Sequence, residues 1–266
     1  MALKKRQTGD LSYFISENIT APHAFTTRLG GVSTGVYASL NLGMHLGDDP
    51  EAVRENWRRI LAEIGGDSTR LAFHRQVHGN HVRRIGEADV VEDIFTPHLV
   101  EGDGLIANVS GVTLVAFSAD CIPILLEDKK TGVVGAIHAG WRSTVLDIAG
   151  KAIEKCVAEF ATDPGDISVA IGAGIGPCCF ETEAEVPQAV QALDLAGEDT
   201  LIKTMGAGKF MVDLKEVNRR LFLRAGVLPE HISLSPHCTA CAPDLFWSHR
   251  KMGQNRGSLA ALICKR

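Results

Sequence analysis

The sequence lacks a long uninterrupted apolar run, and this absence argues against a membrane-spanning helix. The most apolar region, residues 112–126, is interrupted by Ser118 and Asp120, whereas a helix that crosses a bilayer needs about 20 mainly apolar residues. The basic start of the chain is followed by polar residues, so we expect no signal peptide. These features predict a cytoplasmic protein without a membrane partner.

Blocks of basic residues are absent as well. The formal net charge is −5, and a mildly acidic chain without a Lys/Arg cluster is a poor binder of polyanions. We therefore expect no nucleic-acid partner. The sequence leaves the oligomeric state open between monomer and homodimer.

The seven cysteines are an odd number. Without an export signal, a disulfide framework is not expected and the thiols should be reduced. Each cysteine is then a core residue, a metal ligand or a nucleophile. We expect Cys178 and Cys179 to be core residues. Cys238 and Cys241 form a C-x-x-C pair for which a redox pair or second zinc site stays open, but no second C-x-x-C supports a zinc ribbon.

The composition indicates an ordinary globular fold, with 45% apolar and 22% charged residues in 266. Strand-like and helix-like patterns alternate, which favours an α/β or α+β domain. Apolar spacing and capping residues predict helices at 49–64, 144–160 and 213–226. Strands are expected at 24–27, 112–117, 122–127, 133–138, 167–171, 231–234 and 259–263, with a hairpin turn at 128–132 and a long loop at 86–103.

Three polar, metal-competent side chains adjoin these apolar patterns. If the turn at 128–132 pairs its flanking strands, Cys121 and His138 lie on neighbouring strands, and His78 from a third segment could complete a site. Two imidazoles and one thiolate suit zinc and leave a fourth position open. However, an isolated histidine is more often a structural polar residue, and an isolated cysteine is usually part of the core. The residues alone leave both interpretations open.

Several longer motifs carry a resemblance to a known family. In order they are FTTR (25–28), GGVS (30–33), SLNLG (39–43), GDD (47–49), QVHG (76–79), GDGLI (102–106), SADCIP (118–123), HAGWR (138–142), GPCCFE (176–181) and SHR (248–250). With these motifs the chain resembles the YfiH-like, laccase-domain proteins, which are described as polyphenol oxidases and as purine nucleoside phosphorylases. Lys251 and residues 255–257 depart from the family pattern.

The resemblance implies an α/β (α+β) fold in which mixed β-sheets are packed between layers of helices, in a single domain spanning 1–266 with a lead-in at 1–20. It implies that His78, Cys121 and His138 bind zinc, with copper as the alternative. The implied substrates are purine nucleosides and phosphate. The implied activity is phosphorolysis of adenosine, inosine and S-methyl-5'-thioadenosine, with an adenosine deaminase side activity.

Four further residues are candidates for roles in such a reaction. Arg142 and Arg28 could bind phosphate, because guanidinium pairs bidentately with it, although either could instead form a structural ion pair. Asp120 could orient a histidine ligand or a sugar hydroxyl. Gln76, two residues before His78, could contact the purine or ribose. We therefore predict Asp120 and Arg142 as catalytic residues and Arg28 and Gln76 as substrate-binding or phosphate-binding residues.

Other functions remain as alternatives. A copper-dependent polyphenol oxidase would need many paired imidazoles, whereas this chain has ten histidines and no His-x-His pair. A cysteine hydrolase could use Cys121 as nucleophile and His138 as base. A metal-binding or partner-binding module, or the peptidoglycan-editing role attached to bacterial relatives, would show no turnover of nucleosides.

Overall fold

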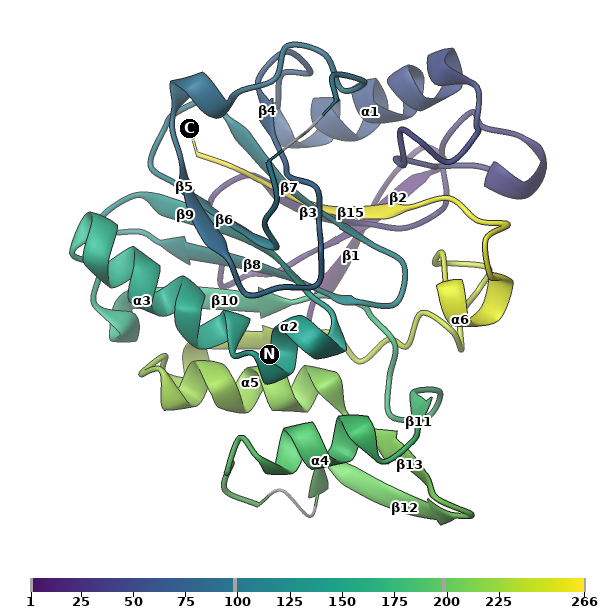
Figure 1. Ribbon diagram of the computed structural model, residues 1–266. Helices are drawn as coiled ribbons and strands as arrows, with labels where there is room; N and C mark the ends of the chain where they lie inside the picture. Colours follow the sequence, from purple (N-terminus) through teal and green to yellow (C-terminus); the bar gives the residue numbers. More distant parts are fainter. Residues whose placement is uncertain (1, 98–99, 198–199, 266) are drawn as a thin grey trace.

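The structure is a computed structural model that describes residues 2–97, 100–197 and 200–265. Two six-stranded sheets pack face to face, with α1 covering the outer face of one and α3 and α5 covering the outer face of the other (Figure 1). This arrangement confirms the expected mixed α/β fold with sheets between layers of helices. The helices are α1 (Pro50–Ile64), α2 (Trp141–Val145), α3 (Ile148–Phe160), α4 (Glu185–Gln191), α5 (Leu214–Arg224) and α6 (His249–Met252).

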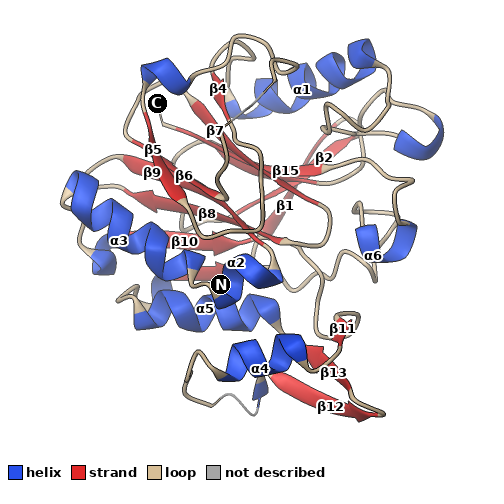
Figure 2. Cartoon of the chain, viewed as in Figure 1, coloured by secondary structure: helices blue, strands red, loops and turns tan. Residues whose placement is uncertain are grey.

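The first sheet has the order β1-β2-β3-β15-β7-β4 and the second has the order β14-β10-β8-β9-β6-β5. A small third sheet, β11-β13-β12, lies with α4 at the bottom of the view in Figure 2. The strands are β1 (Lys4–Thr8), β2 (Leu11–Ile15), β3 (His23–Thr26), β4 (Leu71–Ala72), β5 (Val82–Ile85), β6 (Gly104–Ala107), β7 (Thr113–Ser118), β8 (Ile122–Asp128), β9 (Val133–Ala139), β10 (Ile167–Ile171), β11 (Glu181–Thr182), β12 (Ile202–Gly206), β13 (Lys209–Val212), β14 (Ile232–Leu234) and β15 (Leu259–Cys264).

Alternation along the strands builds the layered core. In β8, Ile124 and Leu126 pack with the residues of α3 and α5, while Leu125 between them packs toward the first sheet. Neighbouring strand residues face opposite sides, so a strand covered on both faces is apolar throughout. This explains why β8 and β9 are buried along their whole length.

The expected helices are confirmed at two of three places. Asp49 caps α1, where its side chain accepts from the Glu51 amide, and Gly65 ends the helix with a φ of 63°. The expected single helix at 144–160 is wrong, because the chain breaks between α2 and α3. Asp147 adopts a φ of 58° there and caps α3 by accepting from the Gly150 amide, since aspartate tolerates left-handed backbone and competes with helical hydrogen bonds.

The expected hairpin at 128–132 is confirmed. β8 and β9 pair antiparallel from Ile122 opposite Ala139 to Asp128 opposite Val133. The Asp128 carboxylate accepts hydrogen bonds from Lys130 and Thr131 inside the turn. Part of the expected lead-in at 1–20 belongs to the first sheet as β1 and β2. Among the described residues, no helix has the length and apolarity needed to cross a membrane.

Candidate metal centre

Cys121 lies where the chain passes from one large sheet to the other. β7 ends at Ser118 in the first sheet and β8 begins at Ile122 in the second. The turn between them gives Asp120 a φ of 96°, and the Ser118 hydroxyl donates to the Cys121 carbonyl at 2.5 Å. The turn therefore supplies the local bend that moves Asp120 and Cys121 out of regular strand alternation.

The structure brings His78 and His138 to Cys121. His138 lies on β9, is only 3% exposed and pairs with Pro123 across the hairpin. His78 lies in the loop between β4 and β5 with a φ of 60° and is exposed. The Cys121 Sγ and His78 Nε2 atoms are 3.7 Å apart, and the two imidazole centroids are 4.8 Å apart at 81°. One ligand atom from each residue lies within 4.8 Å of the others.

Asp103, just before β6, orients both histidines. Its Oδ1 lies 2.8 Å from His138 Nδ1 and accepts from the His78 amide at 3.0 Å. Its Oδ2 accepts from the Gly79 amide at 2.8 Å, and its own carbonyl accepts from the His138 amide. Donation from Nδ1 leaves Nε2 of His138 free to act as a ligand toward Cys121, which is how carboxylates set the tautomer of metal-binding histidines. This role was not predicted from the sequence, although Asp103 stands in the GDGLI motif.

Gly140 allows the three side chains to approach. A Cβ atom at this position would lie 2.6 Å from His78 Cδ2 and 3.3 Å from Cys121 Sγ. The first distance is well below a normal contact between carbon atoms. The backbone that leads from β9 into α2 therefore forms one wall of the centre, and only glycine leaves room for it.

Electrostatics favour the thiolate form of Cys121. Burial alone raises the pKa of this thiol, but the charge of His138 and hydrogen bonds from both histidines outweigh it and lower the pKa to about 6. Burial likewise lowers the pKa of His138, but Cys121 and Asp103 raise it to about 9. The thiolate is the form of cysteine that binds metals or attacks electrophiles.

The donor set fits a transition metal. A tetrahedral zinc site with Zn–S near 2.3 Å and Zn–N near 2.0–2.1 Å places sulfur and nitrogen ligands about 3.5 Å apart, close to the 3.7 Å between Cys121 and His78. The softness of the thiolate also suits copper(I). Three protein ligands, one of them exposed, leave the centre open on the side of His78.

Two predicted substrate residues have other partners in the structure. The Gln76 amide donates to the Phe117 carbonyl at 2.9 Å and accepts from the Phe117 amide at 2.7 Å. Arg28 donates to the carbonyls of Ala38 and Pro243 and stacks 3.8 Å above the Trp247 ring. Both side chains thus act as internal cross-links, and their contact with substrate or phosphate stays a prediction.

The two predicted catalytic residues differ from each other. Asp120 does not orient a histidine ligand, because its Oδ1 accepts from Thr239 Oγ1 at 2.5 Å and its Oδ2 from the Arg250 amide at 2.6 Å. Asp103 holds His138 instead, and contact of Asp120 with a sugar hydroxyl stays a prediction. Arg142 is exposed on α2 and its guanidinium lies 4.3 Å from the Trp141 ring centroid.

A further cation, Arg256, interacts electrostatically with Asp120 and Cys121. Burial lowers the pKa of its guanidinium, and the charges of Asp120 and Cys121 oppose this shift. Arg256 also lines a hollow of about 200 Å³, together with Gly43, Met44, His45, Leu46, Phe117 and Ser258. In the sequence, residues 255–257 are distinguished only as a departure from the family pattern.

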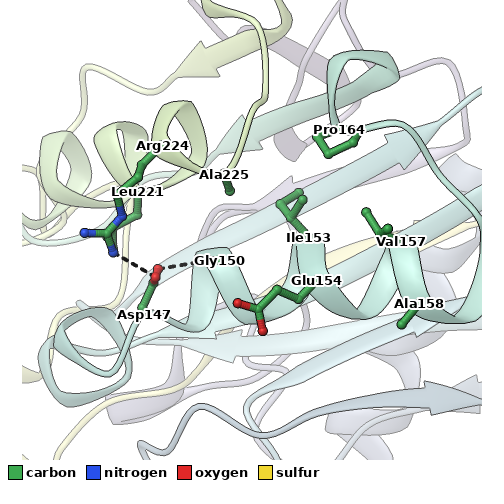
Figure 3. Close-up of a pocket in the computed structure, with 10 residues that line it drawn as sticks. All are labelled: Asp147, Gly150, Ile153, Glu154, Val157, Ala158, Pro164, Leu221, Arg224 and Ala225. Carbon is green, nitrogen blue, oxygen red and sulfur yellow. Dashed lines mark hydrogen bonds and ion pairs between the residues drawn. The ribbon is translucent and has the colours of Figure 1, made fainter.

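A different hollow, of about 440 Å³, lies between α3 and α5 (Figure 3). Asp147 and Arg224 form an ion pair of 2.8 Å at its side, and Ile153, Val157 and Leu221 supply apolar walls. Its lining includes none of His78, Cys121 and His138. The chemistry-bearing side chains therefore lie away from this cavity.

Comparison with known proteins places this chain in a family. The family model described as multi-copper polyphenol oxidoreductase laccase matches residues 22–266. The chain belongs to this family. The predicted relationship to YfiH-like, laccase-domain proteins is thereby confirmed, and the three candidate ligands all lie inside the matched region.

Individual members of the laccase family are similar over most of their length. The purine nucleoside phosphorylase YlmD of Geobacillus stearothermophilus is 38% identical over 91% of this chain and 89% of its own. A protein of unknown prokaryotic origin, named as an adenosine deaminase, is 33% identical over 91% of this chain and 93% of its own. The crystal structure of the hypothetical protein YfiH of Bacillus licheniformis superposes with a TM-score of 0.92 at 30% identity, covering 98% of this chain and 99% of that one.

Proposed function

We propose that the chain is a zinc-dependent purine nucleoside phosphorylase that acts on adenosine, inosine and S-methyl-5'-thioadenosine and also deaminates adenosine. The observation that carries this proposal is the convergence of His78, Cys121 and His138 at an open centre, with Asp103 behind them. The names of the relatives support the two activities. We further propose that residues 1–266 form one domain, because the two large sheets share a single buried layer.

The protein groups have distinct tasks in this proposal. A zinc ion held by the three ligands would polarise oxygen ligands and lower the pKa of water. Asp103 holds His138 in one tautomer and also fixes the backbone of the His78 loop. Gly140 has no side chain and so leaves room for His78 and Cys121 to approach each other. Because these contacts exist before substrate arrives, the site needs little reorganisation during the reaction.

Phosphate needs a cationic neighbour, and two arginines can supply it. Arg256 lies within electrostatic reach of Cys121 and lines a hollow of about 200 Å³. Arg142 follows His138 by one short turn and is exposed. Guanidinium groups bind phosphate through paired N–H donors. We propose Arg256 as the main phosphate ligand and the exposed Arg142 on α2 as a second phosphate-binding group.

Product analysis with adenosine tests the proposed activity. Purified zinc-loaded protein is incubated with adenosine, with and without inorganic phosphate, and the products are separated by chromatography. Adenine that forms only with phosphate is expected, together with inosine from deamination. Neither product from fully zinc-loaded protein would contradict the proposal.

A cysteine hydrolase is the second candidate, because Cys121, His138 and Asp103 also stand in the order nucleophile, base and orienting carboxylate. The second imidazole beside the sulfur, His78, has no role in that arrangement and favours the metal. Chelation separates the two candidates: it should stop a zinc enzyme and leave a cysteine hydrolase active.

Multicopper oxidation is less well supported by the ligand arrangement. Among residues 2–97, 100–197 and 200–265, one group of three or more potential ligands contains imidazoles, and the other consists of cysteines alone. Several coppers would need further histidine groups. Metal analysis that finds several bound coppers per chain would overturn this argument.

A further inference from the structure

Four of the seven cysteines meet at a second place in the molecule. Cys178 and Cys179 follow β10, while Cys238 and Cys241 follow β14. Their sulfur atoms all lie within 4.8 Å of one another. The expectation that Cys178 is a core residue is wrong, because it is exposed, whereas Cys179 is half-buried and packs against the core.

The sheet topology explains why these cysteines meet. β10 and β14 are parallel neighbours, so the loops that follow them leave the same edge of the second sheet. Figure 1 shows these loops continuing to β11 and α6. The Thr239 amide donates to the Gly174 carbonyl at 3.1 Å, and Gly174 and Cys238 form a parallel bridge. The backbone thus holds the two loops together beside the sulfur atoms.

The sulfur geometry suits a shared ion better than one disulfide. Cys241 Sγ lies 3.3 Å from Cys178 Sγ and also 3.3 Å from Cys179 Sγ, so it has no single covalent partner. A tetrahedral ion with four Zn–S bonds of about 2.3 Å separates the sulfurs by about 3.8 Å. That separation lies between the 3.3 Å contacts and the 4.8 Å limit of the group.

Against burial, hydrogen bonds to Cys238 lower the pKa of its thiol and favour negative charge there, whereas burial and sulfur contacts raise the pKa values of Cys178 and Cys179. The Gly176 amide donates to Cys238 Sγ at 3.2 Å. Lys215 is only 5% exposed and lies within electrostatic reach of Asp213 and, more weakly, of Cys238 and Cys178. It is anchored by donating to the carbonyls of Ser235 at 2.8 Å and His237 at 2.9 Å. A buried cation needs nearby negative charge, and four thiolates around a divalent ion carry a net charge of −2.

We propose that Cys178, Cys179, Cys238 and Cys241 form a second zinc site, in which four thiolates close the coordination shell. A closed shell of four cysteines is typical of structural zinc and leaves no position for substrate. The proposal stands independently of the proposed function, because it concerns metal content and not turnover.

This second site is connected to the candidate metal centre through Asp120. Thr239, between the two cysteines of the C-x-x-C pair, donates to Asp120 Oδ1 at 2.5 Å. Arg250 donates its amide to Asp120 Oδ2 and its guanidinium to the Cys179 carbonyl at 2.9 Å. Asp120 directly precedes Cys121. Zinc at the cysteine site would therefore stiffen the turn that places Cys121.

Metal analysis of cysteine variants tests the proposal. Wild-type protein is expected to hold two zinc ions per chain, and the double variant Cys178→Ser/Cys241→Ser one. Cys121→Ala is expected to lose the other zinc and keep the cysteine site. Cys156→Ala is the matched control: this thiol is fully buried in the core, outside both groups, and its loss should leave both ions.

Two further measurements remain decisive if the double variant does not fold. Cobalt substituted into the wild type should give the intense sulfur-to-cobalt absorption of a four-thiolate site, and that absorption should survive in Cys121→Ala. Titration of wild-type thiols with a mercurial should release zinc as four thiols react. The proposal would be overturned if the wild type holds a single zinc ion that is lost in Cys121→Ala. It would also be overturned if the mass of freshly purified protein shows a disulfide among these four cysteines.

Discussion

The two sulfur-containing groups of this molecule lie on either side of Asp120 and differ in their ligands and supports. The candidate metal centre combines one thiolate with two imidazoles, is fixed by Asp103 and opens at the exposed His78. The cysteine group consists of four thiols on two loops that are joined by backbone hydrogen bonds. Three ligands with an opening suit chemistry, whereas four thiolates suit a structural ion. Under the two proposals, zinc would therefore serve different purposes at the two places.

Removal of the Cys121 thiolate should have the largest effect on activity and on the zinc content of the candidate metal centre. In Cys121→Ala we expect phosphorolysis to fall by about a thousandfold or more, because metal ions contribute several kcal/mol of transition-state stabilisation. One zinc should disappear while the cysteine site stays loaded. Kinetics and metal analysis on the same sample check both effects, and Cys156→Ala serves as the control. A fully active variant without that zinc would contradict the account.

Adding a side chain at Gly140, beside the three candidate ligands, should cause the next largest loss of activity. Gly140→Ala adds a Cβ at 2.6 Å from His78 Cδ2, and a displacement of about 1 Å in a catalytic group can reduce the rate by about a hundredfold. The control is Gly86→Ala, whose Cβ would meet only Asp89 at 3.9 Å. Steady-state kinetics on both variants measure the difference. Equal activities would show that the approach of His78 to Cys121 is not required.

Neutralising the carboxylate behind the histidines should weaken metal binding. We expect Asp103→Asn to bind zinc about 10–100-fold less tightly, as found for other partners of histidine ligands. Competition with a chromophoric chelator measures this affinity. Asp93→Asn provides the comparison, since this partly exposed carboxylate pairs with Arg54 on α1 and not with a histidine. An unchanged affinity in Asp103→Asn would remove the role assigned to this residue.

The smallest expected effects distinguish a phosphate-binding role of Arg256 from a structural role of Arg28. Arg256→Gln should raise KM for phosphate by about tenfold, which corresponds to the loss of one charge-assisted hydrogen bond. Arg28→Gln should instead lower the melting temperature, because Arg28 cross-links Ala38, Pro243 and Trp247. Phosphate-dependent kinetics and thermal unfolding of both variants test the distinction. A raised phosphate KM in Arg28→Gln alone would reverse the two assignments.

The sequence predicted the parts of the fold that depend on local patterns. Apolar spacing and caps located α1 and α5, and the turn at 128–132 located the β8–β9 hairpin. The break at Asp147 was not predictable from periodicity, because the apolar pattern continues across it. Very short strands such as β4 and β11 escaped prediction, since two residues show no alternation.

The candidate site was predictable only in part, for a similar reason. The family motifs pointed to His78, Cys121 and His138, and the structure brings them together. The partners of Gln76, Arg28 and Asp120 depend on contacts with distant segments such as Phe117, Trp247 and Thr239. The cysteine group also depends on the parallel pairing of β10 with β14. Contacts between remote segments leave little signal in one sequence.

Removal and return of zinc tests the central claim most directly. Chelator-treated protein is given zinc stepwise, and adenine release from adenosine is followed in the presence of phosphate, with His78→Ala treated in parallel. The account predicts that the wild type loses activity with its zinc and regains it as the centre refills, while His78→Ala stays inactive at every step. Full phosphorolysis by the zinc-free wild type would contradict the account.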